Sequence, residues 1–219
     1  MKKDVLKLMT VCVLLVFLSG AVFSQSRDAQ AADILKEVTA KTKSYKSLKL
    51  DFTYQMENPD ANINEVTEGK VLVNGDKYKL EVAGQKVICD GKTIWTVIPD
   101  AEEVQINTVS DGDNAFSPTK MLSTYSEKYK SKLIPKVTDL NGVNVYALEL
   151  TPNEKKNFDK VNLFVNKDKM QLYAISIYDQ GGSVYTYTIT KFTSDVPVKD
   201  SDFVFSNTEF PGYELIDMR

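Results

Sequence analysis

A stretch of alternating apolar and polar residues limits this chain to a β-rich fold. In LKLDFTYQM, residues 48–56, every second side chain from Leu48 onward is apolar, and Lys, Asp, Thr and Gln fill the positions between. Successive side chains of a strand point to opposite faces, so this segment has one apolar and one polar face. The alternation therefore predicts a half-buried β-strand.

Hairpin turns join this segment to further strands of the same kind. The dipeptides Asn74-Gly75, Asp90-Gly91 and Asn141-Gly142 each lie between two short β-prone segments. Asn-Gly and Asp-Gly favour the type I′ turns that connect adjacent antiparallel strands. Later β-prone segments occupy residues 160–166, 170–178, 183–192 and 202–205. The pattern predicts about ten to eleven antiparallel strands in meander order.

Several of the predicted strands are apolar on both faces. In DGKTIWTVIPD, residues 90–100, the apolar side chains of Ile94, Trp95, Val97 and Ile98 point in both directions. Such strands belong to a sheet that is covered on both faces or that curls around an apolar interior. We therefore expect a mainly β fold in a single domain over residues 25–219.

One predicted helix precedes the strands. It covers residues 33–45 and places Ile34, Leu35 and Val38 on one face. Apolar residues at this spacing are typical of an amphipathic helix that packs on a core. The sequence therefore predicts an N-terminal helix that covers one face of the sheet.

A second predicted helix lies in a long loop between two strands. Ser117-Pro118 predicts its N-terminus, and Met121, Leu122, Tyr125 and Tyr129 follow at helical spacing. A loop of this length inside a compact domain is either functional, as a lid or binding loop, or disordered. We interpret this amphipathic segment as a short helical lid.

The N-terminus has the composition of a secretory signal peptide. Three lysines precede an apolar run over residues 8–18, which is shorter than the ~20 residues that a membrane-spanning helix needs. We expect cleavage after Ser24, with cleavage after Ala21 as the alternative. We then expect the mature chain to be exported from the cytosol.

The charge and cysteine content of the mature chain limit its partners. Removal of residues 1–24, which carry three Lys and one Asp, moves the formal net charge from −3 to −5. This acidic balance argues against binding to nucleic acid and against nonspecific adhesion to an anionic membrane. Cys89 is then the only cysteine, so we expect a buried strand thiol and no intramolecular disulfide.

Catalytic chemistry is poorly represented in the chain. There is no histidine, which excludes Ser-His-Asp triads, Cys-His pairs and His-ligated metal sites. The sequence also lacks a phosphate-binding loop, a GxSxG motif and a paired-cysteine metal site. We therefore expect a protein that is not an enzyme and that holds no metal or cofactor.

Four segments carry a resemblance to a known family. DGKTIWTVIPD resembles the DGKxLWxYxP strand of the periplasmic outer-membrane lipoprotein carrier proteins, the LolA family. SLKLDFTYQ, EGKVLV and SDFVFSNTEFPGYELID resemble the family's first strand, its second strand and its closing segment. The resemblance implies an incomplete, half-open antiparallel β-barrel with an N-terminal helix and a short helical lid. It also implies a carrier that receives lipoproteins from an inner-membrane ABC transporter and releases them to an outer-membrane acceptor.

One segment departs from the family pattern. The best-studied relatives follow their second strand with an Arg-Pro pair, and the arginine holds the lid closed by hydrogen bonds. This chain has Asn74-Gly75-Asp76 at the matching place. The lid must therefore be held in another way, or its closure must be weaker.

The resemblance and the strand pattern together lead to a functional hypothesis. We expect a monomeric periplasmic carrier that binds the acyl chains of lipoproteins, or another lipid, and moves them from the inner to the outer membrane. The predicted wall of the acyl cavity consists of Phe52, Tyr54, Tyr78, Leu80, Trp95, Ile106 and Leu148. The predicted lid face consists of Met121, Leu122 and Tyr125. The alternative is a non-catalytic envelope protein, either a lipid-binding sensor or a protein-interaction scaffold whose sheet is filled by its own side chains.

Overall fold

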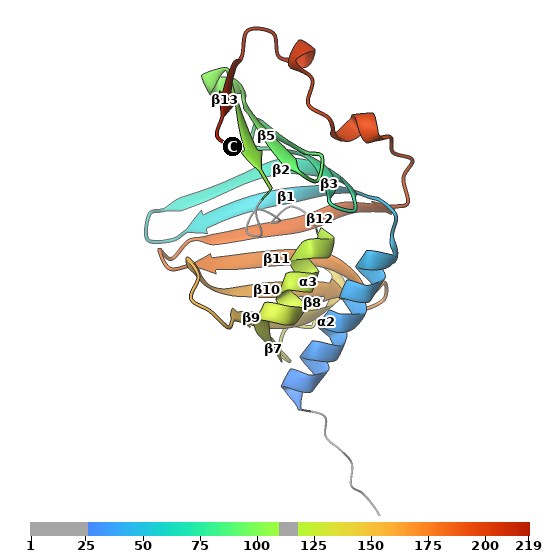
Figure 1. Ribbon diagram of the computed structural model, residues 1–219. Helices are drawn as coiled ribbons and strands as arrows, with labels where there is room; N and C mark the ends of the chain where they lie inside the picture. The colour runs from blue at the N-terminus through green and yellow to red at the C-terminus, as the bar shows by residue number, and fades with distance from the viewer. Residues whose placement is uncertain (1–25, 110–117) are drawn as a thin grey trace, which may run out of the picture.

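A single curved sheet dominates the computed structural model, which describes residues 26–109 and 118–219 (Figure 1). The predicted signal peptide and the predicted N-cap Ser117 lie outside these residues. The sheet has 13 strands in the order β13-β6-β5-β4-β3-β2-β1-β12-β11-β10-β9-β7, with β8 paired to β9. Its two edge strands do not pair with each other, so the barrel is open, as the resemblance implied.

The strands fall into two groups that meet at the β1–β12 pair. The first group comprises β1 (Leu48–Asn58), β2 (Ile63–Asn74), β3 (Lys77–Val82), β4 (Gln85–Cys89), β5 (Thr93–Ile98) and β6 (Glu103–Thr108). The second comprises β7 (Tyr129–Leu133), β8 (Asp139–Leu140), β9 (Val143–Pro152), β10 (Phe158–Asn166), β11 (Gln171–Asp179) and β12 (Val184–Ser194). The expected single meander is therefore corrected to two, because the connection from β6 to β7 runs from one side of the sheet to the other.

The three hairpins that the sequence predicted are confirmed. Asn74-Gly75 lies at the β2–β3 turn, Asp90-Gly91 between β4 and β5, and Asn141-Gly142 between β8 and β9. Asn141 and Gly142 have φ values of 52° and 77°, as a type I′ turn requires. At the second hairpin the Asp90 carboxylate accepts hydrogen bonds from the backbone N–H groups of Lys92 and Thr93, both at 2.8 Å.

Two helices cover the same face of the sheet, which we call the inner face (Figure 1). Helix α2 (Arg27–Ser44) begins at the N-cap Ser26, whose Oγ accepts a hydrogen bond from the Ala29 N–H at 3.1 Å. Helix α3 (Pro118–Lys128) lies between β6 and β7 in the chain and contacts α2. It ends one residue before β7, so Tyr129 starts a strand and does not continue the helix. In the described part of the chain, neither helix is long and apolar enough to span a bilayer.

The C-terminal segment takes a form that the sequence did not predict. A strand was expected over residues 202–205, but a 3-10 helix, η4 (Asp200–Phe203), occupies the first half of this range and buries Phe203 completely. A second turn, η5 (Asn207–Glu209), leads to β13 (Glu214–Asp217), which pairs with β6 in parallel. In Figure 1 this red segment lies along the β5 end of the sheet, away from both helices.

Two apolar clusters fill the inner face. The helix-side cluster joins α2 and α3 to strands β9–β11 and contains the fully buried side chains of Val38, Leu122 and Leu148. The strand-side cluster joins β1–β5 and includes Leu50, Phe52, Leu80 and Ile94.

Candidate functional site

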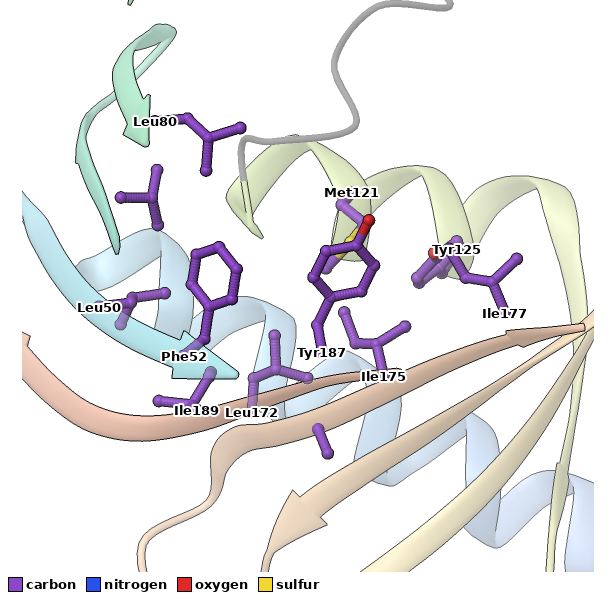
Figure 2. A pocket seen from close by; sticks show the side chains of 12 residues that line it. Leu50, Phe52, Leu80, Met121, Tyr125, Leu172, Ile175, Ile177, Tyr187 and Ile189 are labelled. Carbon is purple, nitrogen blue, oxygen red and sulfur yellow. The ribbon is translucent and has the colours of Figure 1, made fainter. Parts of the chain in front are cut away.

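A cavity lies between the inner face of the sheet and helix α3, where the two apolar clusters meet (Figure 2). Its volume is about 200 Å³. It is lined by Leu50, Phe52, Val71, Leu80, Met121, Tyr125, Leu172, Ala174, Ile175, Ile177, Tyr187 and Ile189. The lining side chains come from β1, β2, β3, β11, β12 and α3, so both halves of the sheet build the site.

The cavity lining is apolar apart from two tyrosine hydroxyls. No side chain among the lining residues carries a charge. Burial of a ligand methylene in such surroundings contributes about 0.8 kcal/mol. The site is therefore suited to hydrocarbon, and in the described residues no group of His, Cys, Asp or Glu could hold a metal ion.

The Phe52 side chain on the cavity wall depends on a glycine in the neighbouring strand. Phe52 of β1 pairs with Gly69 of β2, and its ring lies over the Gly69 Cα. A Cβ at residue 69 would lie 2.4 Å from Phe52 Cζ, which is far inside van der Waals contact. Gly69 belongs to the segment EGKVLV, so a packing requirement explains the glycine in this motif.

Helix α3 has one face toward the cavity and another toward α2. Met121 and Tyr125 line the cavity. Leu122 is fully buried in the helix-side cluster, which also contains residues of α2. Thr39 of α2 lies with its Oγ1 3.3 Å from Ser126 Oγ and 3.5 Å from the Leu122 carbonyl oxygen, to which it can donate. The α2–α3 contact is therefore buried and partly polar.

An ion pair joins α3 to the β2–β3 turn on the other side of the cavity. Lys120 Nζ lies 3.1 Å from Asp76 Oδ1, and these side chains are 30% and 62% exposed. Asp76 follows Asn74-Gly75, the place where relatives of the resembled family carry an arginine. This ion pair links α3 to the first half of the sheet. Its acidic residue lies in the β2–β3 turn, and its basic residue lies on α3.

Several predicted site residues lie on the cavity wall. Phe52, Leu80, Met121 and Tyr125 are among the lining residues. Tyr54 is next to them, because its ring centroid lies 5.0 Å from that of the lining residue Tyr187.

Three other predicted site residues are on the inner face but outside the lining. Tyr78, Leu122 and Leu148 are 2%, 0% and 0% exposed and belong to the apolar clusters on either side of the cavity. Leu122 therefore packs beneath the helix and does not present a face to the cavity. These three side chains pack in the core next to the cavity and do not line it.

Trp95 and Ile106 lie on the opposite, outer face, so their prediction as cavity wall is wrong. In the β4–β5–β6 ladder Ile88 pairs with Trp95 and Trp95 with Ile106, whereas Ile94 pairs with Cys89. Ile94 and Cys89 belong to the strand-side cluster on the inner face, and adjacent residues of a strand point to opposite faces. The Trp95 ring instead stacks on Phe205 of the C-terminal segment at a centroid distance of 6.1 Å.

The sequence analysis missed the cavity residues of the later strands. Leu172, Ile175 and Ile177 of β11 and Tyr187 and Ile189 of β12 line the cavity but were not predicted. Alternation in 170–178 and 183–192 was a usable signal for these positions. It could not show that β12 pairs with β1, which brings Tyr187 opposite Tyr54.

Burial raises the pKa values of several ionisable groups at and near the cavity. It raises the pKa of Tyr125 well above its usual value and the pKa of Tyr187 to about 12, with smaller effects from neighbouring tyrosines. Burial also raises the pKa of the Cys89 thiol, whose Sγ accepts a hydrogen bond from the Gly91 N–H at 3.3 Å. At neutral pH the tyrosines are hydrogen-bond donors, and Cys89 is an inert thiol.

Comparison with solved structures gives several matches of low sequence identity. An uncharacterized conserved protein from Thermus thermophilus has a TM-score of 0.58 and 13% identity, over 86% of this chain and 99% of that one. A LolA superfamily protein from Nitrosomonas europaea has a TM-score of 0.44 and 15% identity, over 80% and 97%. The lipoprotein LppX of Mycobacterium tuberculosis has a TM-score of 0.49 and 13% identity, over 78% and 98%. No curated protein matches the sequence.

Comparison with protein families gives a match that covers most of the chain. The sequence profile described as outer membrane lipoprotein carrier protein LolA matches residues 43–206. This range runs from the end of α2 through η4 and includes every residue that lines the cavity. The open sheet and the helix over its inner face agree with this match. The chain therefore belongs to the LolA family of outer membrane lipoprotein carrier proteins.

Proposed function

We propose that this protein is a periplasmic carrier that binds the acyl chains of lipoproteins and transfers them from the inner to the outer membrane. The observation that carries the proposal is the apolar cavity between α3 and the inner face of the sheet, in a chain of the LolA family. The partners in this proposal are an inner-membrane ABC transporter and an outer-membrane acceptor, and the carrier acts as a monomer.

Loading of the cavity requires movement of α3. A volume of about 200 Å³ is smaller than the ~300–1,000 Å³ of typical ligand pockets, so several acyl chains do not fit beneath the helix as it stands. The contact of α3 with the β2–β3 turn is an exposed ion pair, a class of interaction worth about 0.2–1 kcal/mol. We propose that the N-terminal end of α3 lifts away from this turn, while Leu122 keeps the helix attached to α2.

An unfilled cavity favours a carrier over a scaffold filled by its own side chains. A protein-interaction scaffold has no need for this space, because close packing of the sheet would stabilise it further. A lipid-binding sensor shares the cavity with a carrier but does not release its ligand to an acceptor. Transfer of bound lipopeptide from the protein to acceptor vesicles therefore separates a carrier from a sensor.

Native mass spectrometry of the mature protein with a synthetic triacylated lipopeptide tests the proposal. Met121→Asp is the informative variant, because Met121 lines the cavity and is only partly buried, whereas Leu122 is fully buried in the helix-side cluster. We expect wild type to retain the lipopeptide and the variant to lose it, because a carboxylate in an apolar site has no partner. Thermal unfolding monitors the fold of both proteins.

Met121→Leu is the matched control for this experiment. It keeps an apolar side chain of similar volume, so lipopeptide binding should survive. A wild-type protein that retains no lipopeptide contradicts the carrier proposal. Equal binding by wild type and Met121→Asp contradicts the assignment of the site to this cavity.

A further inference from the structure

Strand β2 is paired on both sides over only half of its length. Residues 69–74 lie between β1 and β3, whereas residues 63–68 pair with β1 alone. The cause is the turn at Ala83 and Gly84, with φ values of 50° and 76°, which leads the chain from β3 back into β4. In Figure 1 the cyan β1–β2 hairpin extends past the end of β3. Residues 63–68 thus form an open strand edge.

This edge offers backbone groups to a further strand. In an antiparallel pair, alternate residues direct their N–H and C=O groups to the partner strand and the others direct them away, so about three residues of this edge point both groups away from β1. In residues 26–109 and 118–219, no backbone hydrogen bond outside the β1–β2 ladder involves residues 63–68. Such an edge is a template on which an extended peptide can pair.

A groove continues from this edge toward the C-terminal segment. Its volume is about 850 Å³, and its lining includes residues 67–69 of β2, the turn at residues 83–85 and Phe210. It shares only Phe52 with the lining of the cavity beneath α3. Pro99 and Phe210 give the groove apolar surface. Because residues 67 and 68 belong to both the edge and the groove, a strand added to the edge runs into the groove.

Acidic side chains surround the open edge. Residues 52–69 carry Glu57, Asp60, Glu65 and Glu68 and no lysine or arginine. Glu65 and Glu68 are three positions apart in the strand, so they lie on opposite faces. In the part of the chain that the structure describes, neither forms a salt bridge. A strand that docks here therefore meets unpaired negative charge on both of its faces.

The two lysines of the groove do not offset this charge. Lys70 Nζ lies 2.8 Å from Glu81 Oε2, and Lys86 Nζ lies 3.9 Å from Glu209 Oε2. Lys86 Nζ also lies 5.1 Å from the centroid of the Phe210 ring. Because both cations already have partners, the groove offers little attraction to an acidic segment.

We infer that residues 63–68 are a docking edge for an extended, basic segment of a partner protein, which adds a strand beside β2 in line with β3. Backbone hydrogen bonds hold the segment, and its lysine or arginine side chains pair with Glu65 and Glu68. Val66, which is 63% exposed, supplies an apolar contact. One end of the segment lies in the groove beside Phe210. This surface is separate from the lipid cavity, so the inference goes beyond the carrier proposal.

A second copy of this chain is a poorer occupant of the edge. Pairing of two such edges brings Glu65 and Glu68 of both copies together without a counter-charge. Like charges on adjacent strands are destabilising, and charged side chains on an edge are a common protection against self-association. The charges therefore favour a basic partner over a copy of the same edge.

Three labelled peptides of equal length test the inference. The first alternates lysine and valine, and the second alternates glutamate and valine. The third is the lysine peptide with an N-methyl group at every residue, so it keeps the charges but cannot donate backbone hydrogen bonds. Fluorescence anisotropy measures the affinity of each for the mature protein. We expect the lysine peptide to bind about tenfold or more tightly than the other two.

Hydrogen exchange and charge variants locate the bound peptide. The lysine peptide should slow amide exchange in residues 63–68. The double variant Glu65→Gln/Glu68→Gln should bind it roughly fivefold more weakly, the effect of two cross-strand charge pairs. Glu127→Gln/Glu154→Gln is the matched control, because it removes the same charge from two exposed residues outside the edge. The control should bind the lysine peptide as wild type does.

The inference has defined ways to fail. It is overturned if the lysine peptide does not bind, if all three peptides bind equally, or if the two double variants weaken binding to the same extent. Protection of residues 63–68 that rises with the concentration of the protein alone places a second copy at the edge, and also overturns it. Lipopeptide binding by Glu65→Gln/Glu68→Gln should equal that of wild type, so this inference and the carrier proposal can fail independently.

Discussion

The inner and outer faces of this sheet are covered in different ways. On the inner face, α3 covers an unfilled cavity and reaches the β2–β3 turn through one exposed ion pair. On the outer face of β4–β6, the C-terminal segment packs with stacked aromatic rings, in which Phe205 contacts both Trp95 and Phe210. The contact of α3 with the first half of the sheet is thus a partly exposed ion pair, whereas the C-terminal segment is held by packed aromatic rings.

This difference explains the position of the single tryptophan. Trp95 lies in DGKTIWTVIPD, one of the segments that resemble the family, yet it faces away from the cavity. A large aromatic side chain contributes most to stability where both faces of its ring are packed. The Phe205 ring stacks on one face of Trp95. The DGKTIWTVIPD segment therefore has a structural role at Trp95, while the candidate site is built from residues outside this segment.

The largest effect is expected from damage to the outer cover. Phe203→Ala removes a fully buried ring and should lower the free energy of unfolding by about 3–5 kcal/mol. Denaturant unfolding measures the change. Val204→Ala is the control, because Val204 is 54% exposed and its loss should change stability by less than about 0.5 kcal/mol.

The Phe203 variant also tests the separation of the two covers. The fraction of protein that remains folded should bind lipopeptide with unchanged affinity, since Phe203 is not among the cavity lining residues. A large loss of affinity in folded protein would show that the two faces are coupled.

An intermediate effect is expected at the cavity wall. Gly69→Val should displace the Phe52 ring, lower stability by about 1–3 kcal/mol and weaken lipopeptide binding. Combination with Phe52→Leu should restore part of both losses, because the smaller side chain leaves room for the new one. Additive losses in the double variant would contradict a direct contact between residues 52 and 69.

The smallest effect on stability is expected at the ion pair. Asp76→Asn keeps the shape of the turn and removes the charge opposite Lys120, which should cost less than about 1 kcal/mol of stability. Hydrogen exchange of the first turns of α3 should nevertheless become faster. Added salt should reduce the difference from wild type, because salt screens exposed charges.

The Lys70–Glu81 ion pair provides the control for this measurement. Its Nζ–Oε2 distance is 2.8 Å and, like the Asp76 pair, it is largely exposed. Glu81→Gln should leave hydrogen exchange in α3 unchanged. Equal effects of the two variants would show that α3 responds to general destabilisation and not to the contact with Asp76.

Much of the local structure followed from the sequence. Alternation identified β1, and the Asn-Gly and Asp-Gly pairs placed three hairpins, because turn conformation depends on a few adjacent residues. Helical spacing identified α3 and placed Met121 and Tyr125 together on one side of it. The family resemblance added the open barrel and the helical cover.

Only part of the candidate site could be predicted from the sequence. Alternation shows which residues of a strand share a face, but it does not show which face lines the cavity. In β5 both faces are apolar, so Ile94 and Trp95 were equivalent in the sequence and opposite in the structure. A one-residue difference decided whether a side chain lies toward the cavity or toward the C-terminal segment.

The sequence by itself determined a mainly β chain with hairpins at defined positions and an amphipathic helix between β6 and β7. These features depend on contacts between near neighbours in the chain. Tertiary structure decided that β1 pairs with β12, that Asp76 meets Lys120, and that the C-terminal segment covers Trp95. Each of these contacts joins residues far apart in the chain, and local pattern contains no information about which distant surfaces will meet.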